Sequence, residues 1–288
     1  MIDYDYLKPK TLDEVFSFLH RYGEKAVLVA GGTDVMVNIR NRKIAPEALI
    51  SLRGLEDLAY IKKDDDAYHI GGLTTHRMLE TSPLAREELS ALHDGASQVG
   101  SVQIRNVATV GGNICNAAPS ADTAAPLLAL DATAVLKGPK GTRKVPLKDF
   151  FTGPSRTVRA PDEILVEFEI PVVEGGFGSA YHKHARRKAM DLPILGVAVF
   201  LKMDGDTIKT ARIALSVAAP TPLRALEAEA FLRGKSFSDE VLKEAGRIAA
   251  RETSPRDSLR GKAWYRREVF ETFVPRMAAR ALERSKKR

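Results

Sequence analysis

The first 55 residues combine one helical hydrophobic pattern with two strand-like ones. A capping box, Thr-Leu-Asp-Glu at residues 11–14, marks a helix start, because the Thr hydroxyl and the Glu carboxylate can each accept a backbone N–H. Apolar residues then recur at helical spacing as far as a stop at Gly23: Val15, Phe16, Leu19 and Tyr22. The apolar run at 26–30 predicts a buried strand, and residues 49–52 predict another. We therefore expect a small α/β unit here.

The next stretch mixes strand and helix patterns. Strands are predicted at residues 58–61 and 68–70 around a turn at 63–66, and at 132–136 and 163–170, with a hairpin-like turn at 138–141. Helices are predicted around 77–79, over 84–99 and over 123–130. Glycines at 175, 176 and 178 then predict a linker or turn.

A strand pair and a run of helices end the chain. Residues 194–203 and 207–218 flank Asp204-Gly205-Asp206, which is a strong hairpin signal. Helices are predicted over 223–232, 238–252 and 262–284. The whole pattern indicates an α+β chain of three units with boundaries at 1–55, 56–174 and 175–288.

Composition narrows the class of protein. The 288 residues are 44% hydrophobic and 28% charged, which is typical of a folded globular chain rather than a disordered one. A single cysteine, Cys115, excludes an intrachain disulfide framework. It also excludes a self-contained iron–sulfur cluster, which needs about four thiolates.

The net charge of +7 has three interpretations: a solvated basic surface, a nucleic-acid interface, or an anionic ligand or acidic partner. The charge is spread along the chain, with dense clusters only at 182–188 (HKHARRK) and 284–288 (RSKKR). The N-terminal segment has early aspartates and no apolar core, and the best apolar run is the eight residues 194–201. We therefore expect no membrane span and a cytoplasmic protein.

Glycine pairs begin at residues 31, 71 and 111, an even interval that we attribute to coincidence because the flanking residues do not match. Two of the pairs follow an apolar or β-branched stretch and precede a small polar residue: Val29-Ala30-Gly31-Gly32-Thr33-Asp34 and Thr109-Val110-Gly111-Gly112-Asn113. Consecutive glycines can turn backbone N–H groups toward one anion, so both turns are candidate diphosphate sites.

An ordinary tight turn is the competing interpretation of each glycine pair. Neither matches a P-loop, since no Gly-Lys-Ser/Thr follows, and neither matches GxGxxG. Asp122 is placed to accept hydrogen bonds from ribose hydroxyls, or it caps the helix that begins at Thr123. The histidines show no metal-ligand spacing and are expected to be surface or structural groups: His20, His69, His76, His93, His182 and His184. A positive charge from residues 182–184 would favour an anionic ligand nearby, while a solvated or subunit-facing basic patch is an equal alternative.

Several stretches together resemble the FAD-binding (medium) subunit of the molybdenum hydroxylases, the family of carbon monoxide dehydrogenase and xanthine dehydrogenase. They occur in family order over nearly the whole chain: 28–37 (LVAGGTDVMV), 70–79 (IGGLTTHRML), 103–131 (QIRNVATVGGNICNAAPSADTAAPLLALD), 180–193 (AYHKHARRKAMDLP) and the tail from Tyr265. The resemblance implies two FAD-binding (PCMH-type) subdomains followed by a C-terminal domain of a small antiparallel sheet plus helices.

The resemblance also implies site residues. The FAD diphosphate would lie against two segments: Val29, Ala30, Gly31, Gly32, Thr33, Asp34, Val35 and Met36, and Thr109, Val110, Gly111, Gly112 and Asn113. Asp122 would bind ribose or ribityl hydroxyls, Val99 would contact the flavin, and Lys183 and Leu192 would approach it from the third unit. No catalytic residue or metal ligand is expected in this chain.

The resemblance implies partners as well. A large molybdopterin subunit and a small subunit with [2Fe–2S] clusters would join this chain as a dimer of heterotrimers, and electrons would pass through FAD to NAD or a quinone. In one branch of the family, that of 4-hydroxybenzoyl-CoA reductase, an inserted loop with cysteines carries an extra iron–sulfur cluster. Here the segment 113–122 is short and Cys115 stands alone, so that cluster is not expected.

Two other classes of function remain open at this point. A stand-alone FAD-dependent reductase of related fold would reduce its own substrate. A nucleic-acid module would need aromatic residues among basic ones, but aromatic residues make up 7% of the chain and are scattered.

Overall fold

A computed structural model describes residues 3–286 of the chain. The first unit is a three-stranded parallel sheet in the order β1-β3-β2. Its elements are β1 (Asp5–Leu7), α1 (Leu12–Tyr22), η1 (Gly23–Lys25), β2 (Ala26–Val29), α2 (Val35–Arg40), β3 (Ala48–Ser51), η2 (Leu52–Gly54) and η3 (Glu56–Leu58). The capping box forms in part: Thr11 Oγ1 accepts the Glu14 N–H at 3.2 Å, while the Glu14 carboxylate accepts the N–H of Lys10. Gly23 ends α1 with a φ of 54°, as predicted.

The second unit is a five-stranded antiparallel sheet in the order β4-β5-β10-β6-β7, with a small two-stranded sheet, β8-β9, beside it. Its strands are β4 (Ile61–Lys63), β5 (Ala67–Gly71), β6 (Thr133–Gly138), β7 (Gly141–Pro146), β8 (Phe151–Gly153), β9 (Arg156–Thr157) and β10 (Ile164–Pro171). Its helices are α3 (His76–Thr81), α4 (Pro83–Glu88), α5 (Ser90–Ala96), α6 (Val102–Val107), α7 (Val110–Cys115), α8 (Ala124–Ala129) and η4 (Leu147–Asp149).

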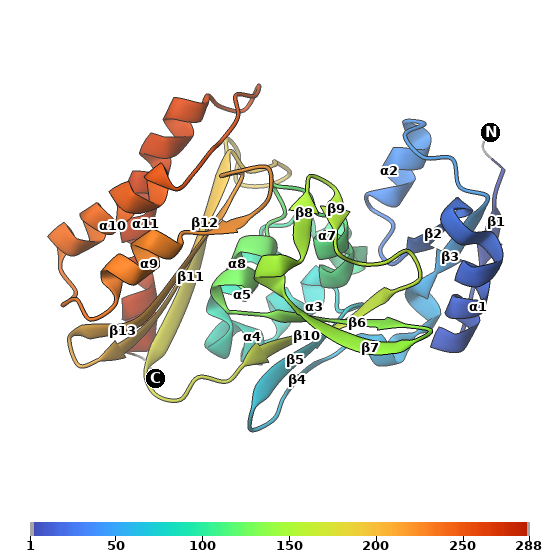
Figure 1. Cartoon of the computed structure of the whole chain (residues 1–288), viewed down its shortest axis with the longest axis horizontal. Helices are drawn as coiled ribbons and strands as arrows, with labels where there is room; N and C mark the ends of the chain where they lie inside the picture. The colour runs from blue at the N-terminus through green and yellow to red at the C-terminus, as the bar shows by residue number, and fades with distance from the viewer. Residues whose placement is uncertain (1–2, 287–288) are drawn as a thin grey trace.

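The third unit is a four-stranded antiparallel sheet in the order β11-β12-β13-β14, with helices packed against it. Its elements are β11 (Phe177–His184), β12 (Leu195–Asp204), β13 (Thr207–Ser216), β14 (Leu223–Arg224), α9 (Leu226–Leu232), α10 (Asp239–Arg251) and α11 (Ala263–Ser285). Figure 1 shows the three units in sequence along the long axis, from the first unit at the right to the third at the left. No helix within residues 3–286 is long and apolar enough to cross a membrane.

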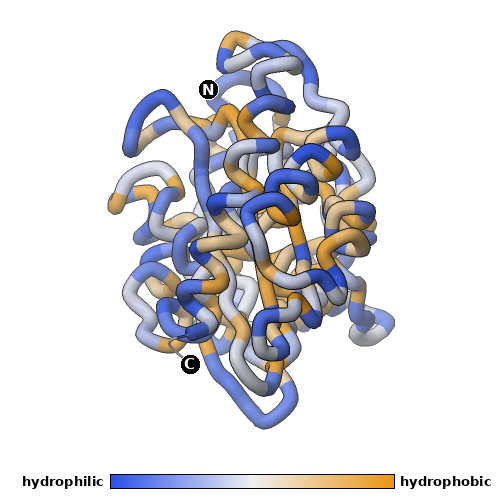
Figure 2. Tube along the Cα trace, turned by 90° about the vertical axis from the view of Figure 1, so that its left-hand side faces the viewer, coloured by the Kyte–Doolittle hydropathy of each residue, from blue (hydrophilic) through white to orange (hydrophobic). Residues whose placement is uncertain are grey.

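Apolar clusters join neighbouring units. Val135, Ile164 and Val166 of the five-stranded sheet pack with Val15 and Ile50 of the first unit. The core around α5 and α8 continues into the third sheet through five buried residues: Phe177, Tyr181, Ala198, Phe200 and Ala214. Figure 2 shows apolar stretches of the trace running through the interior, with hydrophilic loops mainly at the rim.

The apolar run at 194–201 has a simple explanation. Strand β12 packs against the helices α10 and α11 on one face and against the second unit on the other, so both faces are buried. A strand buried on both faces is expected to be continuously apolar.

The structure differs from the sequence predictions of secondary structure in several places. The helix expected over 84–99 divides at Leu89 into α4 and α5, where the Ser90 hydroxyl donates back to the carbonyl of Arg86 at 3.0 Å. The strand expected at 58–61 begins only at Ile61. The sequence predicts no strand at β11, because the end of this strand belongs to the basic cluster at 182–188 and has no strand-like apolar pattern. Lys287 and Arg288 of the other basic cluster lie outside the described residues.

Candidate functional site

A cavity of about 600 Å³ lies where segments of all three units meet. It is lined by most of the residues that the sequence singled out: Ala30, Gly31, Gly32, Thr33, Asp34, Val35, Val99, Thr109, Gly111, Gly112, Asn113, Asp122 and Leu192. Apolar side chains form much of the remaining wall: Leu28, Leu52, Leu73, Ile104, Ile164 and Leu165. The cavity therefore offers both a polar glycine-rich side and an apolar side.

The first glycine pair forms a turn between β2 and α2. Gly32 has a φ of 76°, a left-handed conformation that favours glycine. Among the described residues, the backbone N–H groups of Gly32, Thr33 and Asp34 have no protein acceptor. Three consecutive free donors at a cavity wall are suited to an anion such as a diphosphate.

Arg53, which the sequence analysis did not single out, fixes this turn from behind. Its guanidinium donates to the carbonyl of Ala30 at 3.3 Å and to that of Gly31 at 3.2 Å. Those bonds occupy the carbonyl oxygens of the turn. Partial burial raises the pKa of the Asp34 carboxyl at the cavity wall.

The second glycine pair is not the strand-to-turn junction that the sequence predicted. Thr109 caps the short helix α7 by accepting the Gly112 N–H at 3.1 Å, so both glycines lie in the first helical turn. The N–H groups of Gly111 and Asn113 are also bonded, to the carbonyls of Gly72 and Thr109. This segment therefore lines the cavity without offering a second set of free backbone donors.

Close backbone contacts explain three glycines around the cavity. A Cβ on Gly31 would collide with the carbonyl of Val107, one on Gly72 with that of Leu165, and one on Gly111 with that of Gly72. The three glycine pairs thus allow the first sheet, the second sheet and α7 to pack closely together. Their even spacing in the sequence does not correspond to a structural repeat.

Asp122 is the best-fixed polar group at the cavity. Lys183 Nζ lies 2.7 Å from its Oδ2, and the Tyr181 hydroxyl lies 3.1 Å from its Oδ1. Burial raises the pKa of Asp122 to about 6, although the Lys183 ammonium opposes the shift. Asp122 does not cap α8, whose N-cap residue is Thr123; the Thr123 hydroxyl makes no capping bond and instead donates to Asn113 Oδ1 at 2.6 Å. Its carboxylate still has acceptor capacity for ligand hydroxyls.

Four of the expected residues do not line this cavity. Val29 and Val110 are buried in apolar clusters, and Met36 lies exposed on α2. Lys183 instead lines a smaller cavity of about 290 Å³ with Gln98 and residues 185–188. Its ammonium reaches the main site only through Asp122 and also donates to the carbonyl of Gln98 at 3.0 Å.

The neighbouring histidines do not extend the positive charge of Lys183. His182 stacks on Phe273 of α11 with ring centroids 4.0 Å apart, and His184 Nε2 lies 2.9 Å from the hydroxyl of Tyr265. Burial lowers the pKa of His182 to about 4 and also lowers that of His184. Both rings are therefore neutral at pH 7, and Lys183 alone of this trio is a cation.

The sequence analysis missed other groups in the cavity wall. His76 is fully buried there, and neither ring nitrogen has a hydrogen-bond partner among the described residues. Burial, with a contribution from the Arg105 cation, lowers the pKa of His76 to about 4. Arg159 and Cys115 also line the cavity, and burial raises the pKa of the Cys115 thiol to about 11. His76 lies in the segment 70–79, and the resemblance of that segment to the family is the sequence feature that could have indicated a place at the site.

Two family models account for almost the whole chain. The FAD binding domain in molybdopterin dehydrogenase matches residues 2–173, and the CO dehydrogenase flavoprotein C-terminal domain matches residues 180–281. The chain belongs to the FAD-binding subunits of the molybdenum hydroxylases, and it is an oxidoreductase flavoprotein component.

Individual relatives are similar over their full length. The xanthine dehydrogenase FAD-binding subunit of Escherichia coli O157:H7 is 34% identical over 285 residues, covering 98% of this chain and 97% of that one. The carbon monoxide dehydrogenase medium chain of Hydrogenophaga pseudoflava is 34% identical over 273 residues, covering 95% of each. A solved structure of carbon monoxide dehydrogenase from Hydrogenophaga pseudoflava superposes with a TM-score of 0.94, at 34% identity and 98% coverage of both chains. The predicted α+β FAD-binding fold is therefore confirmed.

The cavity fits FAD on its own geometry. Its volume of about 600 Å³ lies within the usual range of cofactor sites. Three consecutive residues of the cavity wall have free backbone donors, which suits a diphosphate, and Asp122 supplies an acceptor for sugar or ribityl hydroxyls. The apolar wall suits an aromatic ring system. The residues present thus match each chemical part of the cofactor.

Proposed function

We propose that FAD binds in this cavity and that the subunit passes electrons from the [2Fe–2S] clusters of a partner to an external acceptor, NAD or a quinone. The observation that supports this most strongly is the convergence on one cavity of the free N–H groups at 32–34, the Asp122 carboxylate and an apolar wall. Bound FAD supplies a group that takes up electrons singly or in pairs.

The chain's own residues then have separate tasks. The N–H groups of Gly32, Thr33 and Asp34 bind the diphosphate, and Arg53 keeps that turn in place. Asp122 accepts ligand hydroxyls while Lys183 and Tyr181 hold it still. Val99 of the second unit and Leu192 of the third unit contact the flavin. The Lys183 ammonium lies beyond Asp122 and offsets the negative charge of that carboxylate beside the cofactor.

Partners follow from what this chain lacks in its sequence. A [2Fe–2S] cluster needs about four thiolates, and the 288 residues contain one cysteine. We therefore assign the clusters to a small subunit and the molybdopterin to a large one, in a dimer of heterotrimers. The names of relatives as medium chain and FAD-binding subunit support a multi-subunit assembly. The cytoplasmic location stays a prediction from the sequence.

The division into units at 1–55, 56–174 and 175–288 is part of the proposal. The three larger sheets, one in each unit, and the change of family model between residues 173 and 180 support it. The shared apolar clusters indicate that the units fold together, so the boundaries are topological rather than independent cores.

Affinity purification of the tagged chain from its native host tests the electron path. We expect two further chains, one with [2Fe–2S] clusters and one with molybdopterin, and rapid oxidation of the substrate-reduced complex by the physiological acceptor. Full activity of the chain alone on a small substrate would instead indicate a stand-alone reductase.

A further inference from the structure

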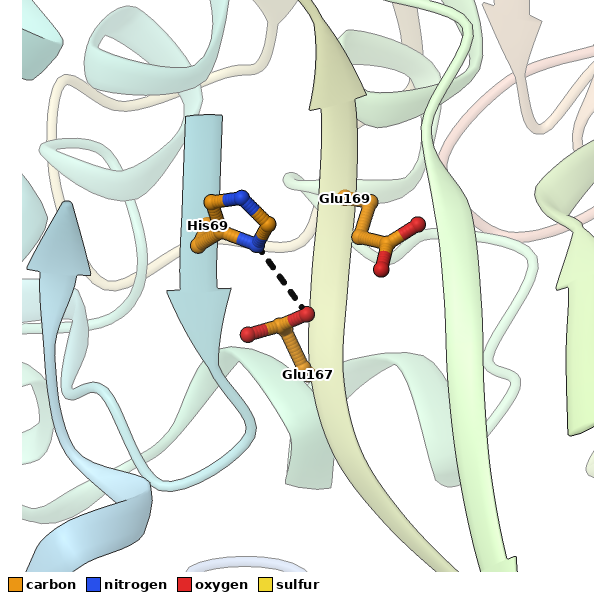
Figure 3. Close-up of side chains that lie close together, drawn as sticks. All are labelled: His69, Glu167 and Glu169. Carbon is orange, nitrogen blue, oxygen red and sulfur yellow. Dashed lines mark ion pairs between the residues drawn. The ribbon is translucent and has the colours of Figure 1, made fainter. Parts of the chain in front are cut away.

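One face of the five-stranded sheet holds three metal-ligating side chains, which come from two neighbouring strands. His69 lies on β5, and Glu167 and Glu169 lie on β10, with Glu169 directly opposite His69 in the antiparallel register. Because side chains alternate between faces, residues 167 and 169 share one face with His69. Figure 3 shows the His69 ring directed at Glu167, with Glu169 beside them on the same strand.

The ligand atoms of this group are close together and reachable from water. One nitrogen of His69 and one oxygen from each glutamate all lie within 4.8 Å of one another. His69 Nδ1 lies 3.1 Å from Glu167 Oε1. The three side chains are 24%, 18% and 23% exposed in chain order, so an ion could enter without local unfolding.

Each of the three side chains is also held by a partner behind it. Asp64 Oδ2 lies 2.9 Å from His69 Nε2, and Asp64 is itself fixed by the backbone N–H groups of Asp66 and Ala67. The Tyr60 hydroxyl donates to Glu167 Oε2 at 2.5 Å, and Lys144 Nζ lies 2.7 Å from Glu169 Oε2.

This outer layer of contacts is what metal sites require. A carboxylate that accepts the proton on one ring nitrogen orients the other nitrogen toward a metal, and bonded carboxylates are likewise held in place. With Nε2–H directed at Asp64, the Nδ1 atom of His69 is the ring nitrogen that lies beside Glu167, 3.1 Å from its Oε1.

We propose that His69, Glu167 and Glu169 form a binding site for one divalent first-row transition-metal ion, for which Zn²⁺ is the best match. One imidazole nitrogen and two carboxylate oxygens are ligands that Zn²⁺ accepts, with water completing the tetrahedron. The two carboxylates balance the charge of the ion, and Nδ1 coordinates as a neutral nitrogen. None of the three residues lines the FAD cavity, so the site is separate from the proposed flavin function. An ion bound there would link β5, which carries His69, to β10, which carries the two glutamates.

Equilibrium dialysis of the full chain against Zn²⁺ at pH 7.5, after chelator treatment, tests the site. We expect about one retained Zn²⁺ per chain, and Mg²⁺, which prefers an all-oxygen octahedron, should not compete at tenfold excess. His69→Ala and Glu169→Gln should each lose this retained ion. Asp64→Asn should keep the stoichiometry and weaken binding by about 10 to 100-fold.

The matched control is His20→Ala, because His20 is an exposed histidine on α1 and does not belong to the ligand group. It should bind Zn²⁺ like the wild type. Wild-type protein without a retained ion, or His69→Ala with unchanged binding, would overturn the proposal. Circular dichroism of each metal-free variant confirms that loss of binding does not come from loss of the fold, and flavin content reports separately on the FAD site.

Discussion

Lys183 Nζ lies 2.7 Å from Asp122 Oδ2, and this buried ion pair links strand β11 of the third unit to the wall of the cavity. Asp94 and Asp131 of the second unit also form ion pairs with the third: Arg284 lies 2.7 Å from Asp94, and Arg224 lies 3.3 Å from Asp131. The third unit is thus anchored against the second at several points, and one anchor is itself a site residue.

Replacing Lys183 with Met should destabilise the protein by about 3 kcal/mol, because removal of one partner leaves a buried carboxylate without its counter-ion. The pKa of Asp122, already raised by burial, should rise further. Urea unfolding at pH 8 measures the change. The double variant Lys183→Met with Asp122→Asn should recover much of the loss, and an additive double variant would contradict the coupling.

Replacing Gly112 with Val should abolish flavin retention while the fold persists. The new side chain would lie between Thr109 Oγ1, 2.9 Å from the added Cβ, and the Ala30 side chain at 3.9 Å, and would occupy the cavity wall. Flavin absorbance per chain after gel filtration measures retention. Gly153→Val on β8 is the control, since Gly153 is outside the cavity and its nearest neighbours are 3.9 Å away. Equal flavin content in both variants would remove Gly112 from the site.

Replacing Gly32 with Val tests the first turn independently. Its φ of 76° disfavours a β-branched residue, so the turn that carries the free N–H groups of residues 32–34 would change its conformation. We expect FAD affinity to fall by at least about tenfold, which corresponds to 1.4 kcal/mol, measured by fluorescence titration of the apoprotein. Unchanged affinity would mean that the diphosphate binds elsewhere.

His76 should make the protein sensitive to acid. Its pKa in the folded state is about 4 against 6.5 for the free group, so the unfolded chain binds more protons between these values and stability falls as pH falls through that window. The His76→Leu variant replaces the histidine with a side chain that cannot take up a proton. The replacement loses no hydrogen bond among the described residues, since both ring nitrogens lack partners. Relative to the wild type, it should gain about 2 to 3 kcal/mol between pH 7.5 and pH 4.5.

Denaturant midpoints at several pH values measure this difference. His182, whose pKa is also lowered to about 4, is present in both proteins and cancels in the comparison. Parallel stability curves for wild type and His76→Leu would show that the imidazole is not buried as described.

The elements predicted correctly from the sequence depend on local signals. The capping box at residues 11–14 and Gly23 define α1, and the turn Asp204-Gly205-Asp206 defines the β12–β13 hairpin within a few residues. Such signals are contained in four to ten neighbouring residues, so no knowledge of the tertiary structure is needed.

The errors depend on contacts between distant segments. Gly111 and Gly112 resemble a turn, but Gly111 is needed because α7 packs against the carbonyl of Gly72. The polar end of β11 is a strand because residues 182–184 pair with residues 195–197 of β12. The metal-ligand set of His69 and Glu167 is invisible in the sequence for the same reason, since about a hundred residues separate β5 from β10.

The flavin content of the purified wild-type protein, isolated alone or with its partners, tests the central claim most directly. The account predicts a yellow protein that releases about one FAD per chain on denaturation, and that loses this FAD in the Gly32→Val and Gly112→Val variants but not in Gly153→Val. A folded wild-type protein that has no flavin absorbance, takes up no added FAD and releases none on denaturation would contradict the account.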